Sequence, residues 1–125
     1  YHFVHWYTHE KICYDKIKNT MNVPNKKYMD LSKLFRDEPI VVKGSLRYKL
    51  KSISKALYDM GLINTSWDFS SECNSGLAAM ALANKIYDEL NEVTEDNHIM
   101  KEIIKYNEVD CKVLWDILRY LRVNH

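Results

Sequence analysis

The most informative stretch of this sequence is IIKYNEVDCKVLWDILRYL, residues 103–121. Its apolar positions recur at steps of three and four residues, which is the spacing of one face of an α-helix. This stripe consists of Ile103, Tyr106, Val113, Leu114, Ile117 and Leu121. Asp96 or Asn97 can cap the amino end of such a helix. We therefore predict a long final helix that runs from this cap to about Val123.

Asp110 falls inside the apolar stripe, four residues after Tyr106 and four before Leu114. A carboxylate that faces a core is costly unless it is hydrogen-bonded, ion-paired or bound to a metal. Tyr106 lies one helical turn earlier, so its hydroxyl can reach the same space. The spacing predicts a phenol and a carboxylate together at the wall of a pocket. The alternative is that Asp110 lies at the edge of the stripe and pairs with a Lys or Arg, while Tyr106 belongs to the core.

The rest of the chain predicts strands near the amino end and helices after them. Residues 2–7 are aromatic and β-branched, which is typical of a strand, and Thr8 can cap a helix that has Glu10 in its first turn. Gly61 is expected to end a later helix. The other expected elements are the end of the first helix near 19–22, a short extended segment at 28–31, a helical turn through 34–35, a strand or extended segment at 40–42, a helix over 46–60 and a helix over 77–90.

Length and composition indicate one globular domain or part of one. The chain has 125 residues, of which 46% are hydrophobic and 28% are charged. These values exclude disordered, collagen-like and low-complexity classes. No run approaches the ~18 apolar residues of a membrane span, so we expect no membrane association. The three cysteines are too few for a disulfide framework, which favours an intracellular setting. The expected location is the cytoplasm, of a cell or of a virus-infected host, with the nucleus as the alternative.

Charge alone identifies no partner. The 18 Lys and Arg residues nearly balance the 17 Asp and Glu residues. A nucleic-acid ligand would therefore have to be bound by a local basic patch or through metal ions.

The string Tyr106-Asn107-Glu108-Val109-Asp110-Cys111, with the leucines that follow it, resembles a known catalytic motif. It is similar to the third motif of DEDD-type 3′–5′ exonucleases of the ribonuclease-H-like superfamily, in the tyrosine subgroup. More narrowly, it resembles the predicted RecB-like or ribonuclease-H-like nuclease branch. Four other segments resemble that branch in the right order: 5–10, which corresponds to the second acidic motif, Asp30-Leu31, the Ser-Leu-Arg run at 45–53, and the small-residue helix at 74–80.

The resemblance implies a fold, an activity and a role for each site residue. The fold is α/β, with residues 1–125 forming a single, partial ribonuclease-H-like domain. The activity is 3′–5′ exonucleolytic or related hydrolysis of DNA or RNA by a two-metal mechanism that uses Mg²⁺ or Mn²⁺. Tyr106 would orient the attacking water, Asp110 would bind a metal ion directly, and Glu10 would bind one directly or through water.

Two departures from the family pattern affect these expectations. The first motif, Asp-x-Glu, supplies two of the four acidic ligands and does not occur in these 125 residues. We expect it upstream of Tyr1, in the rest of a longer polypeptide, so the chain alone should be catalytically incomplete. Glu10 stands where many members have Asp, which changes the expected coordination.

A dense basic run surrounds the start of the helix expected at 46–60. Arg47, Lys49 and Lys51 are predicted to bind the phosphate backbone, with Lys43 beside them and Tyr48 stacking on a base. The alternative is a solvated helix start. Trp6, Trp67 and Trp115 are expected to anchor the core or its edge.

Other interpretations of the whole chain remain open. It could be a non-catalytic module of the same fold that binds nucleic acid or protein, or a helical interaction fragment with an accidental Tyr106–Asp110 pair. A zinc site at His2, His5 and His9 would need a second cluster of ligands, which the sequence does not show. The acid-x-Lys motif of restriction-type nucleases fits residues 110–112 but belongs on a strand.

Overall fold

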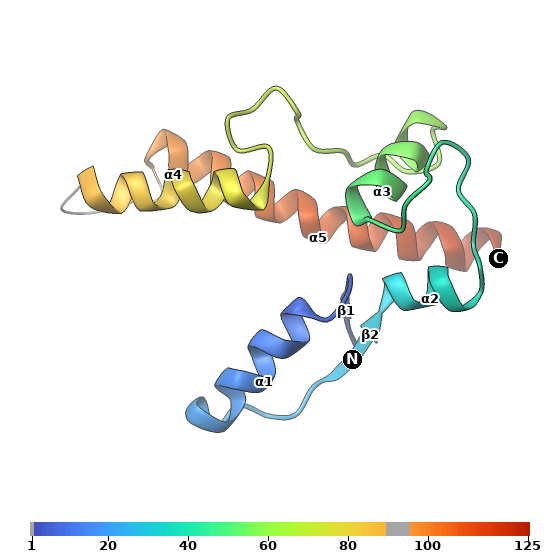
Figure 1. The fold of residues 1–125 in the computed structure, drawn as a ribbon, viewed down its shortest axis with the longest axis horizontal. Coiled ribbons are helices and arrows are strands. Elements are labelled where there is room, and N and C mark those ends of the chain that lie inside the picture. The colour runs from blue at the N-terminus through green and yellow to red at the C-terminus, as the bar shows by residue number, and fades with distance from the viewer. Residues whose placement is uncertain (1, 90–95) are drawn as a thin grey trace. The chain divides into compact units, whose positions relative to one another are not determined.

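The computed structural model describes residues 2–89 and 96–125. In this part, the chain forms a two-stranded parallel sheet and five α-helices, so the fold is mixed α/β and mostly helical (Figure 1). The expectation of strands near the amino end is confirmed at this level. The elements are β1 (His2–His5), α1 (His9–Met21), β2 (Lys27–Asp30), α2 (Leu31–Asp37), α3 (Leu50–Asp59), α4 (Gly76–Glu89) and α5 (His98–Asn124).

The structure divides into two compact units. The first unit consists of residues 1–64 and 114–125, and the second consists of residues 65–113. The long helix α5 therefore contributes its amino-terminal part to the second unit and its carboxy-terminal part to the first.

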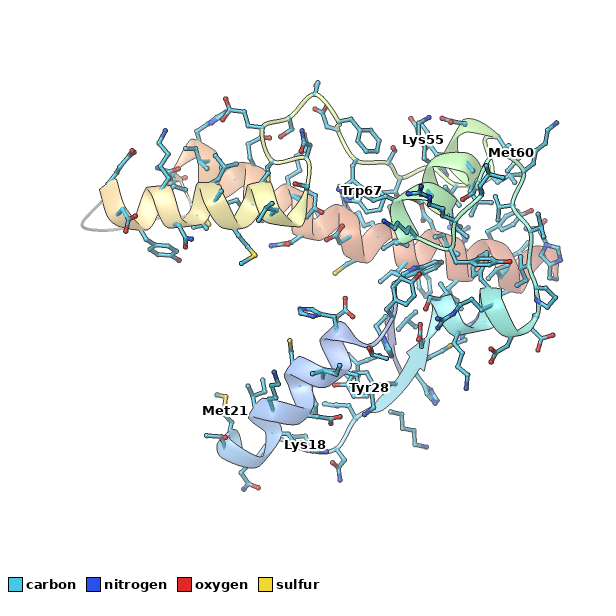
Figure 2. The ribbon with its side chains drawn as sticks, viewed as in Figure 1. Lys18, Met21, Tyr28, Lys55, Met60 and Trp67 are labelled. Carbon is cyan, nitrogen blue, oxygen red and sulfur yellow. The ribbon has the colours of Figure 1, made fainter. Side chains whose placement is uncertain are left out.

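The first unit begins with the β1–α1–β2 segment. The two strands are parallel, because α1 returns the chain to the end at which β1 started, and Phe3 lies opposite Tyr28. Tyr28 also contacts Tyr14 of α1, with ring centroids 5.7 Å apart, and Figure 2 shows its side chain between β2 and α1. After α1, Asn22 adopts a left-handed conformation (φ 50°) that closes the helix by a hydrogen bond from its N–H to the Lys18 carbonyl.

The core of the first unit lies among α2, α3 and the end of α5. Its largest fully buried side chains are Phe35, Leu31, Ile53 and Ile117. The Phe35 ring packs against Trp6, with centroids 5.5 Å apart. Each of these helices thus contributes an apolar face to one shared interior.

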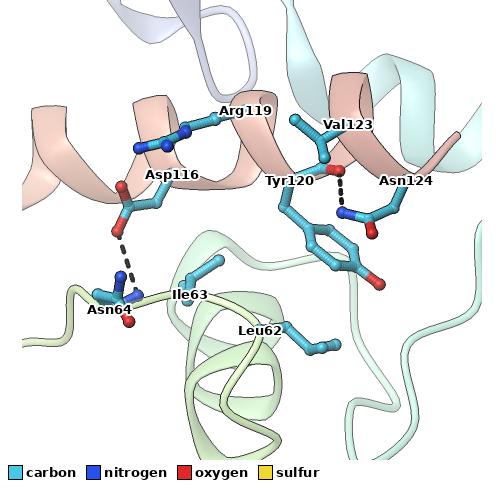
Figure 3. A pocket seen from close by; sticks show the side chains of 8 residues that line it. All are labelled: Leu62, Ile63, Asn64, Asp116, Arg119, Tyr120, Val123 and Asn124. Atoms are coloured by element: carbon cyan, nitrogen blue, oxygen red, sulfur yellow. Dashed lines mark hydrogen bonds between the residues drawn. The ribbon is translucent and has the colours of Figure 1, made fainter.

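A cavity of about 230 Å³ lies between the last turns of α5 and the segment that follows α3 (Figure 3). At its wall, the Asp116 carboxylate accepts a hydrogen bond from the Asn64 N–H at 3.4 Å. The cavity is lined by one acid and one cation, Asp116 and Arg119, among apolar and amide side chains. It contains none of the site residues that the sequence predicted.

The second unit has a smaller core. Its buried apolar side chains are Trp67, Cys73, Ile86 and Val113.

The three tryptophans were expected to anchor the core or its edge. Trp6 and Trp67 are buried as expected, whereas Trp115 is 57% exposed and the expectation for it was wrong. Two residues along a helix correspond to a rotation of about 200°, so position 115 lies opposite the buried positions 113 and 117.

The ends of two helices confirm their capping predictions, whereas Thr8, which precedes α1, makes no capping hydrogen bond through its side chain. The Asn97 side chain accepts hydrogen bonds from the N–H groups of Ile99 and Met100, at 2.9 and 3.3 Å, and so caps α5. Gly61 follows α3 with φ +69°, and its N–H donates to the Tyr58 carbonyl. A left-handed residue after a helix is the usual place for glycine.

The segment between α2 and α3 differs from the prediction. Residues 40–42 do not form a strand, because the Ile40 N–H donates to the Phe35 carbonyl and Val41 is 81% exposed. The next helix begins at Leu50 instead of Leu46, since Lys49 still has extended backbone (ψ 139°). Gly44, at φ +90°, turns the chain between these two points. Residues 40–49 therefore form a loop.

Within the described residues, none of the helices combines the length and the apolar character that crossing a bilayer requires.

Candidate active site

Tyr106 and Asp110 lie one turn apart on α5, within the second unit, and both are half-buried. The Asp110 carboxylate accepts a hydrogen bond from the indole N–H of Trp67 at 2.8 Å. Trp67 is only 5% exposed, so its ring is fixed by the core and its N–H is aimed at the carboxylate. Asp110 is thus an oriented side chain.

The hydroxyl of Tyr106 has a perturbed acidity. Its pKa is raised above the ordinary value first by burial and then by electrostatic interaction with Asp110 and, less strongly, Cys73, while a hydrogen bond from the Gly76 N–H acts in the opposite direction. The influence of Asp110 is consistent with their positions one turn apart on α5. Burial and the nearby carboxylate thus both disfavour the charged phenolate form of Tyr106.

Trp67 is the site residue that sequence reasoning missed. The sequence assigned it to the core, where it does lie, but not to the carboxylate of Asp110. The available signal was its chemistry: a buried indole N–H needs an acceptor, and the sequence already predicts a costly carboxylate at Asp110.

Glu10 is exposed in the first turn of α1, in the first unit. Asp110 belongs to the second unit. The prediction that these two carboxylates share a divalent cation stays a prediction. Among residues 2–89 and 96–125, no group of three or more His, Cys, Asp and Glu side chains could hold a metal ion.

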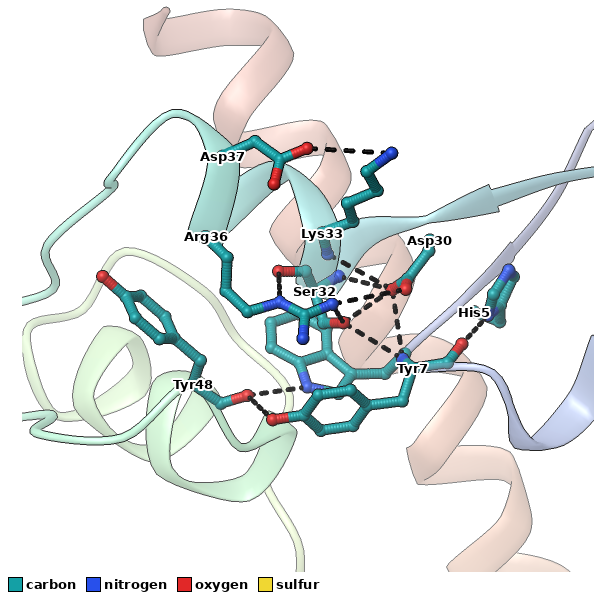
Figure 4. A network of polar contacts seen from close by, with 9 residues as sticks. His5, Tyr7, Asp30, Ser32, Lys33, Arg36, Asp37 and Tyr48 are labelled. Carbon is teal, nitrogen blue, oxygen red and sulfur yellow. Dashed lines mark hydrogen bonds and ion pairs between the residues drawn. The ribbon is translucent and has the colours of Figure 1, made fainter.

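The turn from β1 into α1, which leads to Glu10, is held in an unusual conformation. Tyr7 has φ 64°, in the left-handed region that a bulky residue seldom adopts. Its N–H donates to the Asp30 carboxylate and the Ser32 hydroxyl, at 3.1 and 3.2 Å, and its own hydroxyl donates to the Tyr48 carbonyl at 2.9 Å (Figure 4). The Arg36 guanidinium lies 5.2 Å from the Tyr7 ring centroid. These contacts offset a strain of about 1–2 kcal/mol.

Asp30 is the centre of this network. One of its oxygens caps α2 by accepting the N–H groups of Ser32 and Lys33, at 2.9 and 3.3 Å. Burial raises the pKa of Asp30, but the hydrogen bonds from Ser32, Lys33 and Tyr7 and the charge of His5 outweigh it, so the net pKa lies below the ordinary value. The folded state therefore favours the ionised carboxylate.

Replacing Asp30 is expected to reveal this preference as a pH dependence. Because the folded pKa is lowered, the contribution of the carboxylate is complete above the unfolded pKa of about 3.9 and is lost as the pH falls through the folded value. Asp30→Ala should cost about 1–2 kcal/mol at about pH 7 and clearly less near pH 3. Urea unfolding of both proteins at the two pH values measures this difference. An equal cost at both values would contradict the assignment.

The predicted nucleic-acid-binding residues lie at the start of α3. Arg47 and Lys49 are exposed, and Lys49 is the last residue before the helix. Lys51 is half-buried in the first turn. Tyr48 is also half-buried, and its carbonyl accepts hydrogen bonds from Trp6 and Tyr7.

Comparisons of this chain with protein-family models, with curated proteins and with solved structures find no match. Function is therefore inferred from the residues of the chain and their geometry.

Proposed function

We propose that this chain is part of a metal-dependent nuclease that hydrolyses phosphodiester bonds in DNA or RNA, with 3′–5′ exonuclease action as the first expectation. The observation that supports this proposal most directly is the Tyr106–Asp110–Trp67 arrangement. A half-buried carboxylate, oriented by an indole N–H, lies one helical turn from a half-buried phenol. The carboxylate and the phenol are the side chains that the resemblance to the tyrosine-bearing exonucleases implies, and the indole of Trp67 is an addition from the structure.

Each residue has a chemical task in this proposal. Asp110 offers a hard carboxylate oxygen, which is the ligand type that Mg²⁺ and Mn²⁺ prefer. Tyr106 donates its hydroxyl proton in a hydrogen bond that orients the attacking water. Glu10 offers a second carboxylate from α1. When bound, the divalent ions would supply Lewis-acid stabilisation of the phosphate and an activated water.

The carboxylate set needs partners from outside these residues. Asp110 and Glu10 are two acids, whereas a two-metal site needs several that converge. We propose that an Asp-x-Glu strand elsewhere in the same polypeptide supplies the others. Residues 1–125 alone should then be inactive.

The test compares residues 1–125 with a longer polypeptide that also contains the proposed Asp-x-Glu strand. Both are incubated with a single-stranded oligonucleotide labelled at its 5′ end, with Mg²⁺, with Mn²⁺ and with EDTA. We expect a ladder of products shortened from the 3′ end, only with the longer polypeptide and only with metal ions. Robust cleavage by residues 1–125 would contradict the assigned roles. Binding without cleavage by the longer polypeptide would favour a non-catalytic nucleic-acid-binding module.

A further inference from the structure

The positive charge of this chain is concentrated in one segment. Residues 39–58 contain five cations and no Asp or Glu, although the whole chain has a formal net charge of only +1. The cations are Lys43, Arg47, Lys49, Lys51 and Lys55. A local excess of this kind attracts polyanions even when the total charge is nearly balanced.

The structure separates these five cations into two groups. A cavity of about 730 Å³ lies between the loop at 43–47 and α3, and its lining includes Lys43, Arg47 and Lys55. Lys49 and Lys51, which the sequence predicted as nucleic-acid contacts, are not among the residues that line it. The three cations at the cavity come from both of its walls, so an anion inside it can be approached from two sides.

The cations at this cavity are largely uncompensated. Within residues 2–89 and 96–125, neither the Lys43 ammonium nor the Arg47 guanidinium forms an ion pair. Lys55 pairs with Asp59, one turn later on α3, and both side chains are more than half exposed. Exposed pairs of this type contribute little to stability and can exchange partners readily. The cavity therefore has three cations at its rim against a single carboxylate.

The cavity also has an apolar part. Leu46 is fully exposed and lines it together with Met60, which is 40% exposed; Figure 2 shows Lys55 and Met60 at α3. Gly44 adopts φ +90°, a conformation that other residues rarely adopt, and so allows the loop to turn here beside Ala56 of the helix. Cations beside exposed apolar side chains suit a flexible strand, whose phosphates and bases need different surfaces.

We propose that this cavity binds the phosphate backbone of a single strand of nucleic acid. Lys43, Arg47 and Lys55 would contact phosphates, and Leu46 would contact a base or sugar. The choice of a nucleic acid over another polyanion rests on the proposed nuclease function. The assignment moves the main contacts from Lys49 and Lys51 to residues on the two sides of the cavity.

Fluorescence anisotropy without metal ions tests this site separately from catalysis. The probes are 5′-fluorescein-labelled oligothymidylate and oligouridylate of about 12 nucleotides, in EDTA, with salt varied from about 50 to about 300 mM. The combined variant Lys43→Ala/Arg47→Ala/Lys55→Ala should bind about tenfold more weakly or worse. Its plot of log affinity against log salt should be flatter by about 2 units, since each phosphate contact contributes about 0.7 for single strands.

A matched control removes the same charge elsewhere. Lys16→Ala/Lys26→Ala/Lys85→Ala changes three exposed lysines outside the cavity and should alter affinity by less than about twofold. Leu46→Ser should weaken binding without changing the salt slope, because it removes an uncharged contact. Circular dichroism checks that each variant is folded, and the single variants Lys43→Ala and Arg47→Ala provide smaller steps if the combined one is not.

Three outcomes would overturn the proposal. The first is unchanged binding by the cavity variants, and the second is an equal loss in the control. The third is displacement of the oligonucleotide by poly-glutamate at the same charge concentration, which would indicate an acidic peptide ligand. If the oligonucleotide binds and the cavity variants weaken that binding, but the longer polypeptide does not cleave it, the proposed nuclease function is refuted. The proposed binding site is then still supported.

Discussion

The Asp110→Asn variant of the longer polypeptide should lose about a thousandfold or more of its nuclease turnover while keeping its fold. The loss follows from removing a charged metal ligand, which supplies several kcal/mol of transition-state stabilisation, at about 1.4 kcal/mol for each factor of ten. The fold should persist because the amide oxygen of Asn can still accept the Trp67 N–H, which now bonds the carboxylate at 2.8 Å. Single-turnover cleavage of the labelled oligonucleotide, with urea unfolding of the same samples, measures both effects.

Asp116→Asn is the matched control for this experiment. Asp116 lies on the same helix, is also half-buried and accepts the Asn64 N–H, but it belongs to the first unit and has no proposed catalytic role. It should keep turnover within about twofold. Asp110→Asn turnover within tenfold of the unsubstituted protein would remove Asp110 from the mechanism. A similar loss in both variants would indicate a general effect of the helix.

The accuracy of the fold prediction depended on how local its signals were. The cap at Asn97, the stop at Gly61 and the apolar steps of α5 depend on neighbours within a few residues, and the structure contains all three. Of the two alternatives for residues 40–42, the strand is absent, because β-branched residues favour a strand only where another strand pairs with them. The start of the next helix was predicted four residues too early. The Ile40–Phe35 hydrogen bond has no signal in apolar periodicity.

The candidate site shows the same limit. The closeness of Tyr106 and Asp110 follows from a spacing of four on one helix, and the sequence therefore predicted it. The Trp67–Asp110 hydrogen bond joins residues 43 positions apart, and such a contact depends on how the second unit packs. The position of Lys55 and Arg47 at one cavity also depends on packing, because α3 and the loop before it have to fold against each other before the two charges come together. Sequence patterns indicate which groups need partners, and packing decides the partners.

Phe35→Ala should destabilise the first unit by about 3–5 kcal/mol, which is the usual cost of emptying an aromatic core position. Phe35 is 1% exposed and packs against Trp6, whose N–H donates to the Tyr48 carbonyl at 3.1 Å. The strained turn at Tyr7 follows Trp6 directly. A cavity at Phe35 should therefore loosen this turn as well as lower stability. Urea unfolding measures the first effect, and hydrogen exchange at the Tyr7 amide, which now donates to Asp30, measures the second.

Phe3→Ala makes the same chemical change at a ring that is 48% exposed. Because only about half of the Phe3 ring is removed from water, the substitution should lower the free energy of unfolding by about 1 kcal/mol. The Tyr7 amide should exchange at nearly its original rate in this variant, because Phe3 contacts Tyr28 and Lys26 and not the Trp6 ring. If Phe35→Ala and Phe3→Ala lower the free energy of unfolding equally, Phe35 is not a central residue of the core. Faster exchange at Tyr7 only in Phe35→Ala would instead show that the packing of Phe35 on Trp6 holds the turn that presents Glu10.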